Sequence, residues 1–447
     1  MQFCFTCSMQ NAIDYTNIDL AVNLISQGEN VFITGPAGTG KSFILRILKK
    51  IFKGYITLTA TTGISAANIG GVTIHSWSGI QQLQIPFPQI LWKCKQNNIK
   101  NCDLLIIDEI SMLSAFVLEY LDKLFKLVRN NNYPFGGIQV VFIGDFLQLP
   151  PVAIKEELNV YESKGRYCFE SNVWNELNLK TIYLSKIYRQ NDINFCNILN
   201  HFRQGCLTNS DISSIKNRYV SANLVENKLH LFSTKAHVNN YNKQQLDKIN
   251  SEEVYFESMD KINPALIKNK HTKDQLLKRL DKNIQAQDIV VLKQGCRVML
   301  VKNYKQDNVY NGFCGTVIEV NKTSVTVKFD NGYEGKYYRD KFEYYENETY
   351  IGSRFQIPFI LAYAITIHKA QGLTLDEAVV DCSSAFASGH VYVALSRVKK
   401  LENLYILGFD EGKIYADKKA QIFYKNLLNQ NNIDKSYNYS SKKSAYN

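Results

Sequence analysis

A glycine-rich loop near the start of the chain has residue types suited to holding phosphate. Residues 35–42 fill the pattern G-x-x-x-x-G-K-[ST] at every fixed position. Glycines let backbone N–H groups close around an anion, Lys41 can reach the β- and γ-phosphates, and the Ser42 hydroxyl can bind Mg²⁺. An ordinary glycine-rich helix cap is the alternative, but a strand, the loop and a helix follow in the required order. The sequence therefore predicts a nucleoside triphosphate site whose contacts are Gly35, Pro36, Ala37, Gly38, Thr39, Gly40, Lys41 and Ser42.

Two carboxylates follow a second apolar stretch, residues 104–107. Because Mg²⁺ prefers oxygen ligands and keeps several waters, we expect Asp108 to bind this metal together with Ser42. Glu109 is then placed to orient or deprotonate the attacking water. An Asp-Glu pair is common on protein surfaces, but its position at the end of a buried strand favours the catalytic interpretation.

A third apolar stretch, residues 140–144, leads into the segment Asp145-Phe-Leu-Gln148. We expect Gln148 to sense the γ-phosphate and to couple its loss to motion. The alternative is an ordinary loop glutamine.

Strands and helices alternate from residue 30 to about residue 155. The continuous apolar stretches are short, and helical stretches separate them, as is typical of a parallel sheet covered on both faces. Ligands of such α/β folds bind at the carboxyl ends of the strands, where the polar groups described above fall. The expected strands are residues 30–34, 55–60, 104–108 and 140–144, and residues 109–129 are expected to form a packing helix.

The pattern changes to alternating strands and tight turns over residues 290–350. This pattern indicates a small antiparallel barrel inserted into the α/β chain, whose own pattern resumes after Ile357. Aromatic side chains in residues 337–345 could stack on bases, although packing of the strand faces is the simpler interpretation. Residues 261–282 carry seven Lys and Arg against two Asp, which indicates either a solvated basic face or a nucleic-acid contact.

Composition narrows the class of protein. The 447 residues carry a formal net charge of +11, which weakly favours a polyanionic partner such as nucleic acid. The ten cysteines show no repeated paired spacing, and the single C-x-x-C of Cys4 and Cys7 lacks the second pair that a zinc site needs. No Lys or Arg precedes Lys41, and no apolar run is long enough to span a bilayer. We therefore expect an intracellular protein of the nucleus or cytoplasm, from a cell or a large DNA virus, without membrane contact.

The ordered set of motifs resembles the superfamily 1 DNA helicases, in particular the petite-integration-frequency branch, which is close to the RecD group. The resemblance covers about residues 20–410 and is more specific than any one motif. Beyond the phosphate loop, it rests on residues 59–77, which resemble the motif that contacts single strands, on residues 108–112 and 184–190, on residues 361–376, and on residues 392–397.

The resemblance implies two RecA-like P-loop domains with parallel sheets and ATP between them, and a small SH3-like β-barrel inserted in the second. The expected boundaries are an N-terminal leader and helix at 1–29, a first domain at 30–175, a second domain at 176–260 and 351–427, the basic segment and barrel at 261–350, and a disordered tail at 428–447.

The resemblance also implies roles for individual residues. Arg189 and Arg397 would reach from the second domain to the γ-phosphate and neutralise charge in the transition state. They complete a catalytic set with Lys41, Glu109 and Gln148. No glutamine stands where the family recognises adenine, so Asn17 or Gln10 is expected there. The expected contacts to single-stranded DNA are Thr61, Gly63, His75, Thr366, His368, Lys369 and Gln371.

The implied function is that of a monomeric helicase that couples hydrolysis of ATP with Mg²⁺ to 5′-to-3′ movement on single-stranded DNA. It would unwind duplex or forked DNA in replication, repair, recombination or telomere maintenance, with replication or repair proteins as partners. Two alternatives remain open: a single-strand translocase or remodelling ATPase without unwinding, and the motor subunit of a nuclease complex.

Overall fold

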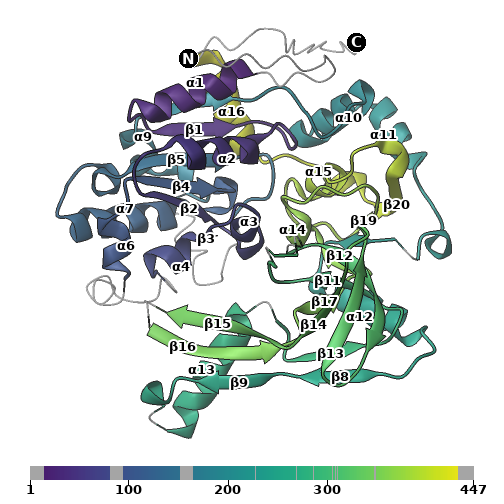
Figure 1. Cartoon of the computed structure of the whole chain (residues 1–447). Coiled ribbons are helices and arrows are strands. Elements are labelled where there is room, and N and C mark those ends of the chain that lie inside the picture. The colour runs from purple at the N-terminus through teal and green to yellow at the C-terminus, as the bar shows by residue number, and fades with distance from the viewer. Residues whose placement is uncertain are drawn as a thin grey trace, which may run out of the picture.

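The computed structural model describes residues 15–430, apart from 81–93, 152–164, 347–348 and the single positions 227, 268, 285, 305, 308 and 310 (Figure 1). The expected leader with Cys4, Cys7 and Gln10, the expected tail beyond residue 430, and Lys268 of the basic segment lie outside the described residues.

The first sheet has six parallel strands in the order β3-β2-β4-β5-β1-β6. It confirms the four strands expected from their apolar runs. The expected boundary at residue 175 is wrong, because β6 pairs with β1 and closes this sheet. The strands are β1 (Val31–Thr34), β2 (Ile56–Ala60), β3 (Val72–Thr73), β4 (Leu104–Asp108), β5 (Gln139–Gly144) and β6 (Lys180–Tyr183).

Helices pack around this sheet. The expected helix at 109–129 begins later, at Ala115, because Ser114 caps its N-terminus and Glu109 has a left-handed backbone with φ of 52°. A single-turn helix, η1 (Ile110–Met112), fills the gap. The α-helices are α1 (Tyr15–Ser26), α2 (Lys41–Ile51), α3 (Gly63–Asn68), α4 (Ile74–Ser78), α6 (Gln96–Lys100), α7 (Ala115–Arg129) and α9 (Asn172–Glu176).

The second sheet has four parallel strands in the order β18-β7-β19-β20, which confirms the α/β class with two parallel RecA-like sheets. Its strands are β7 (His230–Phe232), β18 (Ala364–Thr366), β19 (Ala378–Cys382) and β20 (Leu404–Phe409). Its helices are α10 (Ile193–Gln204), α11 (Asn209–Lys216), α12 (Lys235–Asp247), α14 (Ile367–Ala370) and α15 (His390–Leu395).

Antiparallel strands form the insertion, at the bottom of Figure 1. The expected limits of 261–350 are too narrow, because β9 pairs with β16 and β17 pairs with β11. Tyr337 packs in the core of the five-stranded sheet β14-β13-β12-β11-β17, as expected for a strand face. The elements are β8 (Val254–Glu257), β9 (Met259–Ile262), α13 (Lys270–Asn283), β10 (Ile289–Leu292), β11 (Arg297–Leu300), β12 (Cys314–Val320), β13 (Ser324–Phe329), β14 (Glu334–Tyr338), β15 (Asp340–Glu346), β16 (Thr349–Gln356) and β17 (Phe359–Leu361).

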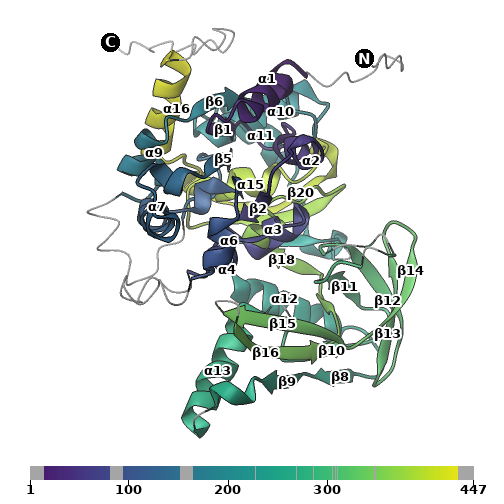
Figure 2. The same cartoon turned by 60° about the vertical axis from the view of Figure 1, so that its left-hand side comes forward.

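The last helix, α16 (Lys418–Gln430), returns to the first sheet. Its residues Tyr424 and Leu427 are buried in the same core as Phe32 and Phe146, and Figure 2 shows α16 standing beside α9. The sequence predicted that residues 418–427 belong to the second domain, and this prediction is wrong, because they pack in the core of the first domain. The helix continues to Gln430. The apolar face of a helix shows that it is buried but does not identify the sheet that covers it.

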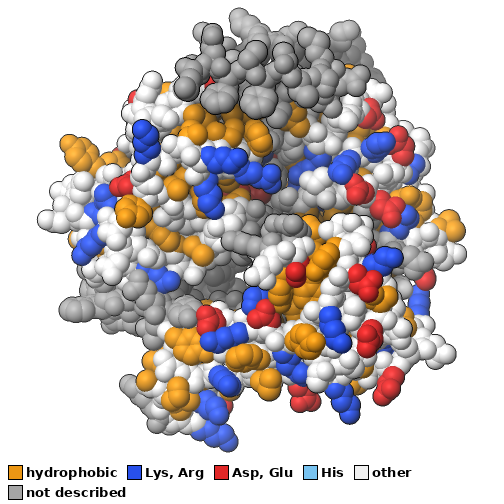
Figure 3. Space-filling model, viewed as in Figure 1, with side chains coloured by type: hydrophobic (Ala, Val, Ile, Leu, Met, Phe, Trp, Pro, Cys, Tyr) orange, Lys and Arg blue, Asp and Glu red, His pale blue; other side chains and the backbone are white. Residues whose placement is uncertain are grey.

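None of the described helices has the length and apolarity that a membrane crossing requires. Lysine and arginine side chains are scattered over the face in Figure 3, between aspartates and glutamates. Net charge alone therefore does not locate a binding surface on this face.

Candidate nucleotide and nucleic-acid sites

The glycine-rich loop connects β1 to α2 and packs against the segment that follows β6. Gly38 has a φ of 80°, and a Cβ there would lie 2.6 Å from Cβ of Arg189, so both conformation and space require glycine. Gly40 precedes α2 without a side-chain cap, so no capping side chain competes with an external acceptor for the N–H groups at the start of the helix. This is the geometry that binds phosphate at a helix N-terminus.

Lys41 lies inside this loop. Its Nζ donates hydrogen bonds to the carbonyl oxygens of Gly35 at 2.7 Å and Pro36 at 2.8 Å. Burial lowers the pKa of Lys41 to about 8, against the opposing effect of Asp145 and Glu109. The ammonium is thus only marginally stabilised here, and the negative charge of a phosphate would favour its protonated form.

Asp108 is the last residue of β4 and Glu109 follows it, close to Lys41 of the loop. The Glu109 N–H donates to Oδ1 of Asp108 at 2.8 Å. Burial and the neighbouring Glu109 carboxylate raise the pKa of Asp108 to about 7. The exposed Ser42 hydroxyl and this carboxylate are hard oxygen donors, which fits Mg²⁺. Within the described part of the chain, no group of three or more His, Cys, Asp and Glu side chains offers a different metal site.

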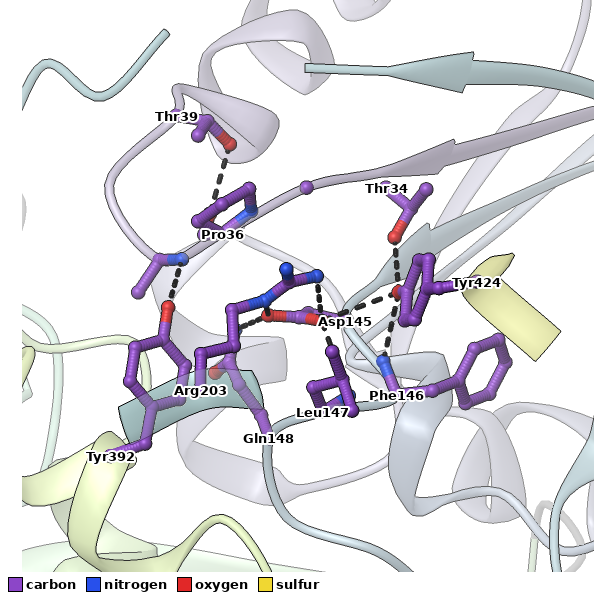
Figure 4. A network of polar contacts seen from close by, with 12 residues as sticks. Thr34, Pro36, Thr39, Asp145, Phe146, Leu147, Gln148, Arg203, Tyr392 and Tyr424 are labelled. Carbon is purple, nitrogen blue, oxygen red and sulfur yellow. Dashed lines mark hydrogen bonds and ion pairs between the residues drawn. The ribbon is translucent and has the colours of Figure 1, made fainter. Parts of the chain in front are cut away.

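Asp145 and Arg203 form a buried ion pair between the two domains (Figure 4). The guanidinium of Arg203, on α10, donates to both carboxylate oxygens at 2.8 and 2.9 Å. Burial alone would raise the pKa of Asp145, but Arg203 outweighs it and holds the pKa below its usual range. Nε2 of Gln148 also donates to Asp145, at 3.3 Å. The expected γ-phosphate sensor is therefore attached, through Asp145, to a helix of the second domain.

Two tyrosines add to this network from opposite sides (Figure 4). The Tyr392 hydroxyl, on α15, accepts a hydrogen bond from the Ala37 N–H at 2.8 Å. The Tyr424 hydroxyl, on α16, lies 2.6 Å from Oγ1 of Thr34 and accepts from the Phe146 N–H at 3.1 Å. The second domain thus contacts the phosphate loop through Tyr392, and the last helix contacts the end of β1, just before the loop, through Tyr424.

Arg189 and Arg397 lie together beside the loop. Nη1 of Arg189 donates to the Ser396 carbonyl at 2.9 Å, and Nε of Arg397 donates to the Val393 carbonyl at 2.8 Å. Burial and the nearby Arg397 lower the pKa of Arg189 to about 9, and burial also lowers the pKa of Arg397. Two adjacent buried cations repel each other, so an anion bound between them and the loop would stabilise both.

Arg397 lies two residues beyond the end of α15 in the second domain. Arg189 comes instead from the connection between β6 and α10, where the Tyr188 N–H donates to the Gly38 carbonyl at 2.8 Å. This connection packs against the phosphate loop at Gly38, and the role of Arg189 at the γ-phosphate stays a prediction.

Among the expected DNA contacts of the first domain, Thr61 adjoins the nucleotide site. Oγ1 of Thr61 donates to the Glu109 carbonyl at 2.9 Å, Gly63 begins α3, and His75 lies half-buried on α4. Burial lowers the pKa of His75, which keeps its ring neutral at physiological pH.

The expected DNA contacts of the second domain surround α14. Thr366 caps this helix by accepting from the Lys369 N–H at 3.2 Å, and Lys369 is exposed. The ring of His368 stacks on Phe386 with 6.2 Å between centroids. Gln371 differs from these residues, because it is 3% exposed and its Nε2 donates to Oε2 of Glu109 at 3.0 Å.

Sequence reasoning missed four residues of the network and left adenine recognition open. Asp145 and Tyr392 stand inside recognised motifs, whereas the signal for Arg203 is a charge on the apolar face of α10. Nothing in the sequence pattern marks Tyr424. For adenine recognition, the side-chain amide of Asn17 donates to the Tyr183 carbonyl at 3.5 Å, and its role stays a prediction. The missed residues are Asp145, Arg203, Tyr392 and Tyr424.

Comparison with known proteins gives a consistent result. A family model described as PIF1-like helicase matches residues 8–212. The ATP-dependent DNA helicase PIF1 of Emericella nidulans is 33% identical over 92% of this chain, and the chain spans 63% of that relative's length. The crystal structure of Pif1 helicase from Candida albicans superimposes with a TM-score of 0.81 at 34% identity, covering 92% of this chain and 99% of that one. Pif1 helicase from Bacteroides, solved in complex with ADP-AlF3 and single-stranded DNA, gives a TM-score of 0.71 at 30% identity, over 94% of this chain and 98% of that one.

Proposed function

Because this chain belongs to the PIF1-like helicase family, we propose that it is an ATP-dependent DNA helicase that moves 5′ to 3′ on single-stranded DNA and unwinds duplex or forked DNA. One observation carries the proposal: groups suited to phosphoryl transfer converge on the phosphate loop from both domains. Lys41 and Glu109 come from the first domain, and Arg397 comes from the segment that follows α15 in the second. ATP bound there would join the two domains, and its hydrolysis would release them.

Each residue of the site has a defined task in this proposal. The loop N–H groups and Lys41 bind the phosphates, while Glu109 orients the attacking water. Arg189 and Arg397 neutralise the charge that develops on the transferred phosphoryl group. Gln148 reports the presence of the γ-phosphate to the second domain through Asp145. Mg²⁺, held by Ser42 and Asp108, supplies further neutralisation when it is bound.

Single-stranded DNA would cross both domains next to this site. Hydroxyl, imidazole and ammonium groups suit contacts to phosphate and sugar that do not read the bases. Support comes from the Bacteroides relative, solved with single-stranded DNA. The proposed contacts are Thr61, Gly63, His75, Thr366, His368 and Lys369.

We also propose that the chain works as a monomer inside the cell, in the nucleus or cytoplasm, together with replication or repair proteins. Two domains that each supply part of one nucleotide site within a single chain support a monomeric motor. The proposed domains are residues 15–183 with α16, and residues 184–417, which include the antiparallel insertion at 254–361.

Strand displacement from tailed duplexes tests the function. With ATP and Mg²⁺, we expect release of the displaced strand from a duplex with a 5′ single-stranded tail, but not from a blunt duplex or a 3′-tailed duplex. The Lys41→Ala protein serves as the inactive control. Displacement from the 3′-tailed duplex alone would contradict the proposed polarity. ATP hydrolysis stimulated by single strands without any displacement would identify a translocase instead.

A further inference from the structure

A cavity of about 500 Å³ opens next to α14, outside the nucleotide site. It lies between α12, the two-stranded ribbon β8–β10, and the segment that runs from β17 through β18 to α14. Figure 2 shows α12 between β18 and the strands of the insertion. The cavity is therefore formed where the second domain meets its insertion, and Thr366 and Lys369 form part of its wall.

The end of the cavity nearest α14 is basic. Lys235, in the first turn of α12, lines the same cavity as Lys369 of α14, and partial desolvation together with the charge of Lys235 lowers the pKa of the Lys369 ammonium. Asn239 and Lys243 continue the same wall, because residues four apart share one face of a helix. Two lysines that repel each other across an opening form a site for an anion such as a phosphate diester.

The interior of the cavity offers an apolar floor and an accessible aromatic ring. Val290 and Ile365 are buried in the floor, whereas Tyr255 on β8 is 58% exposed. The Tyr255 hydroxyl donates to the Glu253 carboxylate, which also lies 3.3 Å from Nζ of Lys293. The ring is thus held by its hydroxyl while much of its surface remains open to a ligand.

Charge is distributed unevenly along the cavity. Asp247 lies at the last residue of α12, about 18 Å along the helix axis from Lys235 at a rise of 1.5 Å per residue. The pair of Lys235 and Lys369 therefore favours an anionic backbone at the end of the cavity far from Asp247. Carboxylates at the far end can accept hydrogen bonds from the exocyclic amino groups of bases. This polarity matches a nucleotide whose phosphate stays at the mouth and whose base points inward.

We propose that this cavity is a nucleotide subsite for single-stranded DNA, in which a phosphate lies between Lys235 and Lys369 and the adjoining base stacks on Tyr255. The inference rests on the proposed function, because the strand reaches the cavity from the contacts at Thr366 and Lys369. The subsite would extend the single strand held by the protein beyond α14 and would stabilise binding without strong base preference, since every base has a stacking face.

A matched pair of variants isolates the ring. Tyr255→Phe and Tyr255→Ala both lose the hydrogen bond to Glu253, but only Tyr255→Ala loses the stacking surface. With fluorescently labelled oligo-dT, we expect about tenfold weaker binding for Tyr255→Ala and little change for Tyr255→Phe. Tyr338→Ala is the control, because Tyr338 is 59% exposed on β14 and does not line the cavity. Melting temperatures of all variants report on folding.

Two further measurements locate the strand. Oligo-dT that carries one iodouracil should cross-link to Tyr255 under ultraviolet light, at one position along the oligonucleotide. Lys235→Ala should reduce the slope of log Kd against log salt concentration by about one, as expected when one phosphate contact is lost.

The outcomes separate the subsite from the proposed function. If the unsubstituted protein binds oligo-dT, but Tyr255→Ala binds as tightly as Tyr255→Phe and no cross-link falls in the cavity, the subsite is wrong and the helicase proposal stands. If the unsubstituted protein does not bind single strands, both are wrong. A cross-link to Tyr255 together with the difference between the two variants supports the subsite.

Discussion

The side-chain amide of Gln371 donates a hydrogen bond of 3.0 Å to the Oε2 atom of Glu109. Glu109 follows β4 at the nucleotide site, and Gln371 follows α14, two residues after Lys369. Oε1 of Gln371 is buried without a hydrogen-bond partner among the described residues. One side chain therefore connects the group expected to orient the attacking water with the segment expected to bind DNA.

We predict that Gln371→Ala uncouples these two sites. Without the amide, DNA bound at α14 has no direct contact through which to influence the Glu109 carboxylate. Stimulation of ATP hydrolysis by oligo-dT should fall about tenfold, the effect of roughly 1.4 kcal/mol of lost coupling. Steady-state hydrolysis at a series of oligo-dT concentrations measures this change.

The affinity for DNA distinguishes this role from direct contact. We expect the Kd of Gln371→Ala for oligo-dT to remain within about threefold of the Kd of the unsubstituted protein, because the amide binds Glu109 and not DNA. If the Kd for oligo-dT rises strongly while saturating DNA stimulates ATP hydrolysis normally, Gln371 contacts DNA directly and does not couple the two sites. Lys369→Ala, whose side chain is exposed, provides the comparison for a contact residue.

The lowered pKa of Lys41 predicts that nucleotide affinity depends on pH. The ammonium form binds phosphate, so affinity should be constant below the pKa of about 8 and should fall as the pH rises above it. Because phosphate binds the protonated form more tightly, the pKa of Lys41 rises when nucleotide is bound. Between pH 7 and pH 9 we expect about a tenfold loss of affinity for a non-hydrolysable ATP analogue, measured by equilibrium titration.

Lys41→Arg is the control for this pH dependence. Arginine keeps its charge through this range, so the affinity of the variant should be lower overall but nearly independent of pH between 7 and 9. If the unsubstituted protein shows the same flat profile, the buried lysine does not titrate in this range.

Much of the nucleotide site was predictable because its signals are local. Glycines, a lysine and a hydroxyl at fixed spacing define the phosphate loop, and carboxylates directly after buried strands identify Asp108 and Glu109. Parallel strands then bring those strand ends together without any knowledge of strand order. Local signals did not identify Arg397, because its position at the site depends on how the second sheet packs against the first. Its role was predicted only from the resemblance to a family.

The rest depended on long-range pairing that residue patterns do not encode. The four residues of β6, Lys180–Tyr183, carry no pattern that assigns them to one sheet, and their pairing with β1 decides the domain boundary. α16 carries an ordinary amphipathic pattern, so its return to the first domain follows only from packing against Phe32 and Phe146. Asp145 and Arg203 are separated by 58 residues in the sequence, and a charge pattern does not predict which charged residue pairs with which across such a separation.

Arg397→Ala should separate nucleotide binding from turnover. The residue is 1% exposed and belongs to the cation pair expected to stabilise the transition state. We expect kcat to fall by about 10³-fold or more, while the Kd for the ATP analogue changes little. Equal losses in binding and in turnover would show a ground-state contact instead. Because Arg397 also bonds to the Val393 carbonyl, the melting temperature must be measured alongside.

The pair of Asp145 and Arg203 predicts a stability effect with a characteristic pH dependence. Arg203→Ala leaves a buried carboxylate without its partner, which should cost about 3–5 kcal/mol of unfolding free energy at pH 7. The surface pair of Lys216 and Glu411 is the control, and Lys216→Ala should leave the unfolding free energy nearly unchanged because solvent screens an exposed pair.

The direction of the pH dependence follows from the pKa of Asp145. Paired with Arg203, the carboxyl has a pKa below its unfolded value, so its contribution to stability is complete above that value and is lost as the pH falls through the folded pKa. Unpaired in Arg203→Ala, the buried carboxyl should have a raised pKa and take up a proton more readily in the folded state. The deficit of the variant, measured by denaturant unfolding, should therefore shrink between pH 7 and pH 5. A deficit that stays constant over this range would mean that lost packing of the Arg203 side chain, rather than the unpaired charge, destabilises the variant.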